Sequence, residues 1–235
     1  MTCAGTIAGM MTGLVLASSQ PVVIGTEAPF PAYTYVDESG VISGFERDIM
    51  DQICQRQALS CTWQLANFDE LIPGVMAGRF DIVLGGMAVT DDRRRLVDFT
   101  QSYSNSDSEE WYIGRPGSAP PAAALIGVQS GTVHEDHARR MGYDYQSFPT
   151  EPQVLSALVA GKVELALGPY STRLDIQDFV DANGLDFLYS DIVPDDGVAM
   201  AVCQGNSDLL DSLNAALDAM RADGTLETLE SRWFD

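Results

Sequence analysis

The stretch FDIVLGGMAVTDDRRRLVDF, residues 80–99, joins an apolar run of strand length to two glycines and then to a polar helical pattern. Thr90 is a favourable N-cap, and Asp91 and Asp92 suit the first turn of a helix that begins there. Apolar runs of strand length alternate with helical patterns from residue 22 onward. This alternation predicts an α/β protein with open, parallel sheets.

The alternation is interrupted once, by the extended stretch 108–116 and a Pro- and Ala-rich segment after it. Two α/β lobes are therefore predicted, lobe 1 over residues 21–110 and lobe 2 over residues 111–194. Residues 195–235 contain one more strand and a long helical pattern, which we expect to complete lobe 1. The chain then crosses twice between the lobes, which predicts a two-strand hinge and an interlobe cleft of the kind that binds small ligands.

The charge and motif content argues against several classes of function. The chain has 34 acidic residues against 13 basic ones and a net charge of -21. Nucleic-acid binding depends on many Lys and Arg contacts to phosphate, so no nucleic-acid partner is expected. The sequence has no Gly-x-Ser-x-Gly motif, no phosphate-binding Gly-rich motif and no Cys-x-x-Cys motif, and no cofactor is expected.

The first 20 residues are apolar, rich in small residues and too short to span a bilayer, which predicts a cleaved secretory signal. The alternative is a buried N-terminal element, because the basic residues that usually begin a signal are missing. In an exported protein, the spacing of Cys54 and Cys61 permits a disulfide, with two buried thiols as the alternative. Cys203 lies in an apolar run and is then predicted to be an unpaired core residue.

Three consecutive arginines, Arg93, Arg94 and Arg95, follow the Thr90 N-cap. Successive helical residues point about 100° apart, so one of the three is expected to face the cleft and the others solvent or acidic neighbours. An arginine beside backbone N–H groups at a glycine-rich strand end, such as that of Gly86, suits a carboxylate or a phosphate. The alternative is a solvated run of charges that pairs with surface acids.

The only histidines, His134 and His137, are spaced i, i+3 on a predicted helix. We expect them on its exposed face, and no third ligand accompanies them, so no metal site is predicted. Glu27 and Tyr170 are the only other candidates for acid–base chemistry, and no catalytic residue is predicted.

Five segments occur in a consistent order from about residue 22 to the end of the chain: VVIGTEAPFPAYTYVDESGVISGFERDIMDQI, FDELIPGVMAGRFDIVLGGMAVTDDRRRLVDF, GVQSGTVHEDHARR, LVAGKVELAL and GTLETLESRWF. Together they resemble solute-binding protein family 3, the periplasmic amino-acid-binding proteins of ABC importers. The most specific piece is Thr-x-x-Arg followed by Val-Asp-Phe. The spacing of Cys54 and Cys61 also resembles the disulfide of the histidine and lysine/arginine/ornithine binders in this family.

The resemblance implies a two-lobed periplasmic-binding-protein fold that closes on its ligand. It further implies a periplasmic monomer that delivers a small carboxylate, such as an amino acid or an amino-acid-like compound, to a membrane ABC permease. Two alternatives remain open for the same fold. One is a cleft enzyme such as a dehydratase, and the other is a ligand-sensing subunit for a membrane receptor.

The resemblance also assigns ligand-binding positions. Arg93 matches the arginine that grips the ligand α-carboxylate, and Thr132 matches a residue whose backbone and hydroxyl hold the same group. Phe30 and Phe68 match positions that pack against the ligand side chain. Glu27 lies at a place that is acidic in binders of basic amino acids.

Two positions depart from the family pattern. Ala88 stands where the pattern has a Ser or Thr that helps to hold the ligand, and Gly168 stands where it has the Asp that pairs with the ligand α-ammonium. An unpaired, desolvated ammonium is costly, so we expect a carboxylate ligand whose amine is absent, substituted or placed elsewhere. Gly168 is also expected to open room beside Tyr170, so that Tyr170 contacts the ligand.

Overall fold

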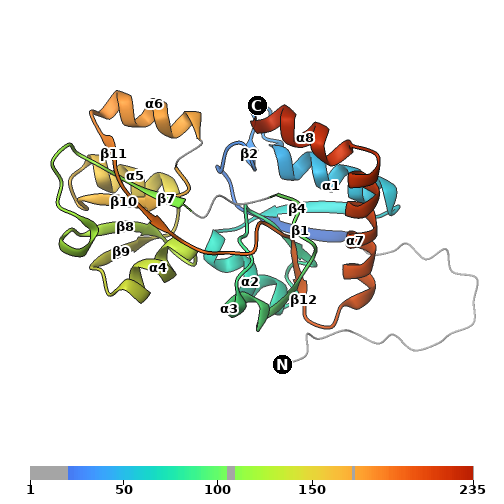
Figure 1. Cartoon of the computed structure of the whole chain (residues 1–235). Coiled ribbons are helices and arrows are strands. Elements are labelled where there is room, and N and C mark those ends of the chain that lie inside the picture. The colour runs from blue at the N-terminus through green and yellow to red at the C-terminus, as the bar shows by residue number, and fades with distance from the viewer. Residues whose placement is uncertain (1–20, 105–108, 171–172, 235) are drawn as a thin grey trace, which may run out of the picture. The chain divides into compact units, whose positions relative to one another are not determined.

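The computed structural model describes residues 21–104, 109–170 and 173–234. The predicted secretory signal lies outside these residues. Contacts between Cα atoms divide the chain into two compact units (Figure 1). The described residues of unit 1 come from the ranges 1–66, 70–105 and 197–235, and those of unit 2 from 67–69 and 106–196.

Unit 1 is built on a five-stranded sheet with the order β4-β1-β5-β12-β6. Strand β1 is parallel to β4 and β5, whereas β12 is antiparallel to both β5 and β6. The prediction of an all-parallel sheet is therefore wrong here, because the last strand enters unit 1 without the crossover helix that a parallel neighbour needs. The strands are β1 (Val22–Thr26), β4 (Cys61–Leu65), β5 (Ile82–Val83), β6 (Val97–Phe99) and β12 (Ala201–Cys203).

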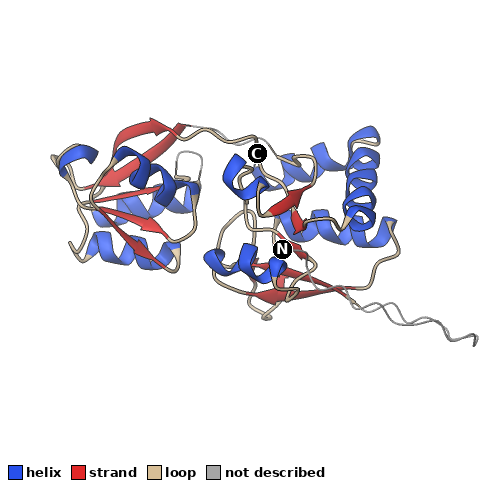
Figure 2. Ribbon diagram, turned by 90° about the horizontal axis from the view of Figure 1, so that it is seen from below, coloured by secondary structure: helices blue, strands red, loops and turns tan. Residues whose placement is uncertain are grey.

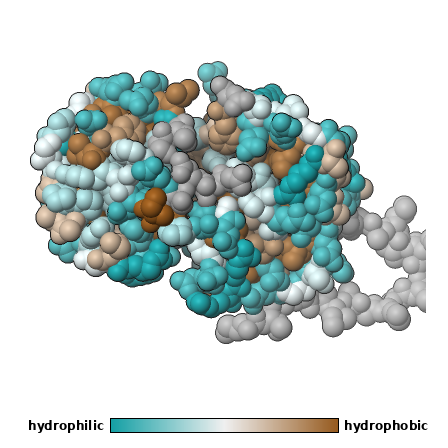
Figure 3. Space-filling model, viewed as in Figure 1, coloured by the Kyte–Doolittle hydropathy of each residue, from teal (hydrophilic) through white to brown (hydrophobic). Residues whose placement is uncertain are grey.

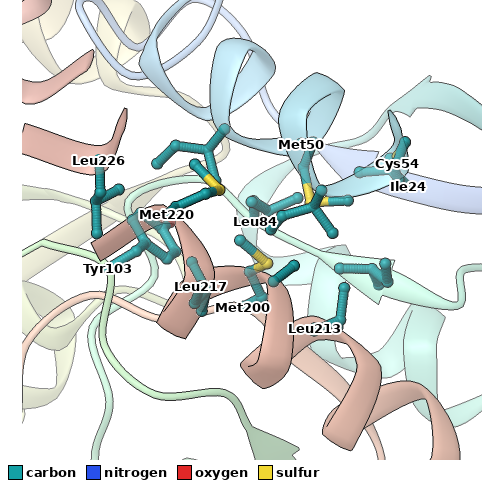
Figure 4. Packing of buried hydrophobic residues seen from close by; sticks show 14 of the residues in the cluster. Ile24, Met50, Cys54, Leu84, Tyr103, Met200, Leu213, Leu217, Met220 and Leu226 are labelled. Atoms are coloured by element: carbon teal, nitrogen blue, oxygen red, sulfur yellow. The ribbon is translucent and has the colours of Figure 1, made fainter. Parts of the chain in front are cut away.

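Three helices cover one face of this sheet: α1 (Phe45–Arg56), α7 (Ser207–Ala222) and α8 (Thr225–Phe234). Their apolar stripes meet strand residues such as Ile24 and Val202 in one buried cluster, part of which Figure 4 shows. The cluster draws helical side chains from both ends of the chain, including Ile49, Met50, Ile53, Leu213, Leu217, Met220 and Leu226. Unit 1 thus depends on its C-terminal helices for its core.

Helix α2 (Phe68–Met76) follows β4 along the chain. The helix contains Pro73 and continues through that residue. The Phe80 ring packs closely on two glycines, Gly25 and Gly74. A Cβ at Gly25 would stand 2.7 Å from the ring and a Cβ at Gly74 would stand 2.4 Å from it, so neither position has room for a side chain. The remaining elements are α3 (Asp91–Arg94) and a small hairpin of β2 (Tyr35–Val36) and β3 (Ile42–Ser43).

The predicted disulfide between Cys54 and Cys61 is confirmed, with 6.3 Å between the Cα atoms. It joins the end of α1 to the first residue of β4. Cys203, expected to be an unpaired core residue, is instead disulfide-bonded and only partly buried. A short strand next to a turn leaves its side chain near the surface, which the apolar run around it concealed.

The double replacement Cys54→Ala, Cys61→Ala is expected to lower the free energy of unfolding by about 2.5 kcal/mol. A bridge with a sequence separation of 7 residues removes loop freedom from the unfolded chain, and the chain-entropy model gives this magnitude. Urea unfolding under non-reducing conditions measures the difference. Adding reductant should bring the wild-type midpoint down towards that of the variant, and equal midpoints without reductant would contradict the expectation.

Unit 2 contains a second five-stranded sheet, with the order β11-β7-β10-β8-β9. Strand β8 is parallel to β9 and β10, whereas β7 is antiparallel to β10 and β11. This sheet is again mixed and not parallel throughout, because the extended stretch that interrupts the sequence alternation forms β7. The strands are β7 (Glu109–Gly114), β8 (Ile126–Gln129), β9 (Tyr145–Phe148), β10 (Leu165–Gly168) and β11 (Asp186–Ile192).

Helices lie on both faces of the unit 2 sheet, and Figure 2 shows them flanking its strands. Helix α4 (Val133–Met141) packs on one face through Ala138, beside Tyr112 and Leu165. Helices α5 (Glu151–Val159) and α6 (Leu174–Asn183) pack on the other, against Ile113 and Ala166. Neighbouring strand residues thus point to opposite cores, as the pleat requires. A single 3₁₀ turn (Pro121–Ala123) precedes β8.

The face that Figure 3 shows is mainly polar. In Figure 3 hydrophilic residues cover most of the visible face of each unit, and apolar residues form scattered patches. Among the described residues, no helix combines the length and the apolar character needed to cross a membrane.

Candidate functional site

The predicted site residues of unit 1 gather at the carboxyl ends of two neighbouring strands, β1 and β5. The chain leaves β1 towards β4 on one side and returns to β5 on the other, so β1 and β5 form a topological switch point. Ligands of open α/β sheets bind outside the carboxyl ends of such strands. Glu27 and Phe30 follow β1, and Gly86 and Ala88 follow β5.

A buried carboxylate that the sequence analysis missed, Glu46, holds the glycine turn after β5. Its Oε1 accepts hydrogen bonds from the backbone N of Gly85 at 3.1 Å, the backbone N of Gly86 at 2.7 Å and the Tyr103 hydroxyl at 2.5 Å. Its Oε2 accepts from the Thr34 hydroxyl at 2.9 Å. Burial raises the pKa of Glu46, although these four hydrogen bonds oppose the rise. The signal that could have revealed it is the position of this acid on the apolar face of α1, beside Phe45, Ile49 and Met50.

The turn at Gly86 brings two predicted site residues together. Gly86 has a φ of 59°, and a Cβ at this position would stand 2.5 Å from Cε1 of the Phe30 ring. Only glycine adopts this conformation readily and also lets the ring approach so closely. Phe30 in turn stacks on Tyr33, with 5.2 Å between the ring centroids.

Arg93 is the buried member of the arginine run. Its side chain lies close to the backbone of the same turn, and Nη1 donates to the Ala88 carbonyl oxygen at 2.6 Å. Thr90 caps the helix as predicted, and its hydroxyl accepts from the Arg93 backbone N at 3.3 Å. Arg93 is 7% exposed, whereas Arg94 and Arg95 are exposed and Arg95 pairs with a surface acid. The helical rotation therefore separates the three arginines as expected.

Glu27 and Phe68 are both buried in the structure, at 8% and 7% exposure. Glu27 directly follows β1, and Phe68 is the first residue of α2, shortly after β4 ends. Each thus lies beyond the carboxyl end of a parallel strand of unit 1, which is the edge that holds Phe30 and Gly86.

Unit 2 has the corresponding switch point at its neighbouring parallel strands β8 and β10. Thr132 follows β8 and is the N-cap of α4. Its hydroxyl donates to the Gln129 carbonyl oxygen at 2.7 Å and accepts from the Glu135 backbone N at 3.3 Å. The side chain of Thr132 thus fixes the helix start, where backbone N–H groups favour anions.

Gly168 ends β10, and the space in front of it is filled. A Cβ at Gly168 would stand 2.5 Å from Cζ and 2.8 Å from the hydroxyl oxygen of Tyr170. The expectation of open room beside Tyr170 is therefore wrong, because the ring of Tyr170 turns back over the glycine. Tyr170 is 1% exposed and belongs to the apolar cluster of α5 and α6. Desolvation raises the pKa of its hydroxyl well above the ordinary value.

Buried charged groups gather at the same edge of unit 2. Arg173 pairs with Glu151 at 2.7 Å, both with side chains at most 10% exposed, and burial raises the pKa of Glu151 against the opposing effect of Arg173. His134 and His137, expected on an exposed face, are both 6% exposed. Each faces an acid of the adjoining strands, Glu110 at 3.4 Å and Asp191 at 2.9 Å. The polar sequence of α4 concealed this, because a histidine with a partner distant in sequence can be buried.

Two α/β units, each with a mixed sheet between helices, and a chain that passes from the first to the second and back, define the fold of the periplasmic binding proteins. The chain belongs to the bacterial extracellular solute-binding proteins, family 3, whose family model matches residues 22–235. The family resemblance seen in the sequence is thereby confirmed, and the protein is a solute-binding protein.

Proteins that are similar in sequence and in structure agree with this family assignment. The chain is 28% identical to an L-arginine-binding protein of Pseudomonas aeruginosa over 236 residues, covering 93% of this chain and 89% of that protein. An ancestral arginine-binding protein bound to arginine superposes with a TM-score of 0.82 at 27% identity, covering 92% and 98% of the two chains. A periplasmic His/Glu/Gln/Arg/opine family-binding protein from Silicibacter pomeroyi in complex with lysine gives 0.80 at 27% identity, covering 91% and 96%.

Proposed function

We propose that this protein is a periplasmic receptor that closes on a small carboxylate-bearing ligand and delivers it to a membrane ABC permease. The ligand is an amino acid or an amino-acid-like compound. The observation that carries the proposal is the buried guanidinium of Arg93, held by the Ala88 carbonyl oxygen beside the glycine turn after β5. A desolvated arginine at the carboxyl end of a strand suits bidentate recognition of a carboxylate.

The other assigned residues have complementary roles. Arg93 binds the ligand carboxylate together with the N–H groups near Thr132, while Phe30 and Phe68 pack on the ligand side chain. Gly86 allows the Phe30 ring its place, and the backbone of Ala88 orients Arg93. Glu27 contributes negative charge for a basic ligand. The remaining two residues, Gly168 and Tyr170, form the wall of the unit 2 switch point.

The relatives named above support an amino-acid ligand, since they are described as arginine-binding or as bound to lysine. They are binding proteins, and we propose that this chain likewise binds its ligand without converting it and acts as a monomer. Recovery of a bound ligand unchanged after prolonged incubation supports this over a dehydratase of the same fold. Conversion of the ligand would favour the enzyme.

A thermal-shift screen of the full chain is the direct test. A ligand at a hundred times its dissociation constant adds about 2.7 kcal/mol of stability, which moves the melting temperature by several degrees. The screen compares amino acids, their 2-oxo and N-substituted derivatives, and opines with sugars and inorganic anions as controls. We expect hits among the carboxylates, and for a hit a smaller radius of gyration in solution scattering. A response to sugars alone would contradict the proposal.

A further inference from the structure

Glu110 and His134 oppose each other at the carboxyl edge of the unit 2 sheet. Glu110 is the second residue of β7 and His134 the second residue of α4. The His134 Nε2 lies 3.4 Å from the Glu110 Oε1, and the two side chains are 7% and 10% exposed. This Nε2 forms no hydrogen bond with any of the described residues.

A buried polar atom without a hydrogen-bond partner is uncommon in a folded protein and calls for an explanation. A carboxylate only accepts hydrogen bonds, and a neutral imidazole protonated on Nδ1 also presents Nε2 as an acceptor. With His134 in that tautomer, the two buried acceptors at this distance suit one group that carries several donor hydrogens and a positive charge. An ammonium or guanidinium nitrogen has both properties.

The charges nearby favour a cation at the same place. The guanidinium of Arg173 is shared between Glu151 at 2.7 Å and Asp175 at 2.6 Å. Among the ion pairs of the described residues, Glu110 has His134 as its partner. Two carboxylates thus share one guanidinium, and a third buried carboxylate, Glu110, is costly unless a positive group compensates it.

The pair also lies beside the position that lacks an acid. Gly168 is paired with Trp111 across β10 and β7, so Glu110 is the next residue of β7 towards the carboxyl edge. The Tyr170 ring covers Gly168, and the Tyr170 hydroxyl is subject to the charge of Glu110. Glu110 therefore lies beside the position of Gly168 in sheet register, at the same carboxyl edge of the unit 2 sheet.

We propose that Glu110 and His134 bind a positively charged nitrogen of the ligand, as a primary or substituted ammonium or a guanidinium group. The inference rests on the proposed function and narrows its substrate class to carboxylates that also carry a cationic nitrogen.

The test measures dissociation constants by titration calorimetry on the full chain with matched probes. L-arginine and octopine are compared with 5-guanidino-2-oxopentanoate, which lacks the α-amine, and with L-citrulline, which lacks the guanidinium charge. We expect the wild type to bind L-arginine at least tenfold more tightly than 5-guanidino-2-oxopentanoate or L-citrulline, each of which lacks one of the two cationic groups of L-arginine. Glu110→Gln and His134→Leu should each reduce that preference to threefold or less.

Matched controls separate charge recognition from folding. Glu109→Gln changes the neighbouring acid, and His137→Gln changes a buried histidine that already contacts Asp191 at 2.9 Å. Both variants should keep the wild-type preference for L-arginine. The melting temperature of ligand-free Glu110→Gln should stay equal or rise, since an incompletely compensated charge is removed, whereas a structural pair would lose several degrees.

Three outcomes contradict the proposals, and they can be told apart. If the wild type binds none of these probes and no carboxylate from the screen, the proposed function fails and this inference with it. If it binds carboxylates but prefers L-arginine over neither of the two probes that lack one of its cationic groups, the inference alone fails. A preference that survives in Glu110→Gln and His134→Leu likewise overturns the inference and leaves the proposed function standing.

Discussion

Arg93→Ala is expected to weaken binding of the carboxylate ligand by about 3 kcal/mol, or more than a hundredfold in the dissociation constant. The guanidinium is buried and oriented by the Ala88 carbonyl oxygen at 2.6 Å, so it meets a ligand anion in a desolvated place. Truncation to alanine removes the hydrogen bonds from the guanidinium and also leaves the ligand carboxylate without its counter-charge. Titration calorimetry with the best ligand from the screen measures the loss.

The neighbouring arginines are the matched controls for this prediction. Arg94 and Arg95 have the same charge and lie in the same short helix region, but they are exposed. Their replacement by alanine should cost under about 1 kcal/mol each, because exposed ion pairs contribute little. The loss of binding free energy for Arg93→Lys should fall between those for Arg93→Ala and for the two exposed arginines, since lysine keeps the charge and loses the bidentate geometry. Equal losses at all three arginines would indicate a diffuse basic patch and contradict the assignment.

Glu46→Ala is expected to lower the free energy of unfolding by about 4 kcal/mol. The change removes the carboxylate that accepts four hydrogen bonds. The N–H groups of Gly85 and Gly86 and the Tyr103 hydroxyl then remain buried without this acceptor. Each unsatisfied buried donor costs about 1–3 kcal/mol, and the lost side-chain volume adds to this. Urea unfolding at neutral pH gives the difference.

Two milder variants show whether the loss comes from the hydrogen-bond network. Glu46→Gln keeps the shape and one acceptor oxygen, and it should cost less than half as much as Glu46→Ala. Tyr103→Phe removes one donor together with its hydroxyl and should cost about 1 kcal/mol. A loss below 1 kcal/mol for Glu46→Ala would mean that the glycine turn holds its conformation without the carboxylate.

Much of unit 1 could be predicted from local patterns. The spacing of Ile49, Met50, Ile53 and Cys54 is typical of one apolar face of a helix, and these four residues lie in the core. Thr90 and its acidic neighbours indicated the start of a helix, and the structure confirms the cap. Such features depend on residues a few positions apart, which is the range over which helix periodicity and capping act.

The features that sequence reasoning missed depend on residues far apart in the chain. The direction of β12 is decided by its neighbours β5 and β6, more than 90 residues earlier, and its own apolar run carries no sign of direction. The position of the Tyr170 ring over Gly168 is a choice of side-chain conformation that composition does not reveal. Burial of His134 depends on Glu110 of another element, so a polar helix pattern gave the wrong face.

The place of β12 within the sheet of unit 1 sets the order in which the chain can fold. This strand lies between β5 and β6, so residues from the C-terminal part must arrive before those two strands are joined by hydrogen bonds. The strands of unit 2, by contrast, all come from one uninterrupted part of the chain, residues 109–192. A chain that lengthens from its N-terminus therefore contains all the strands of unit 2 before it contains β12, α7 and α8 of unit 1. The sheet of unit 1 is thus the last to have all its strands, and until then its unpaired strand edges are open to pairing with other chains.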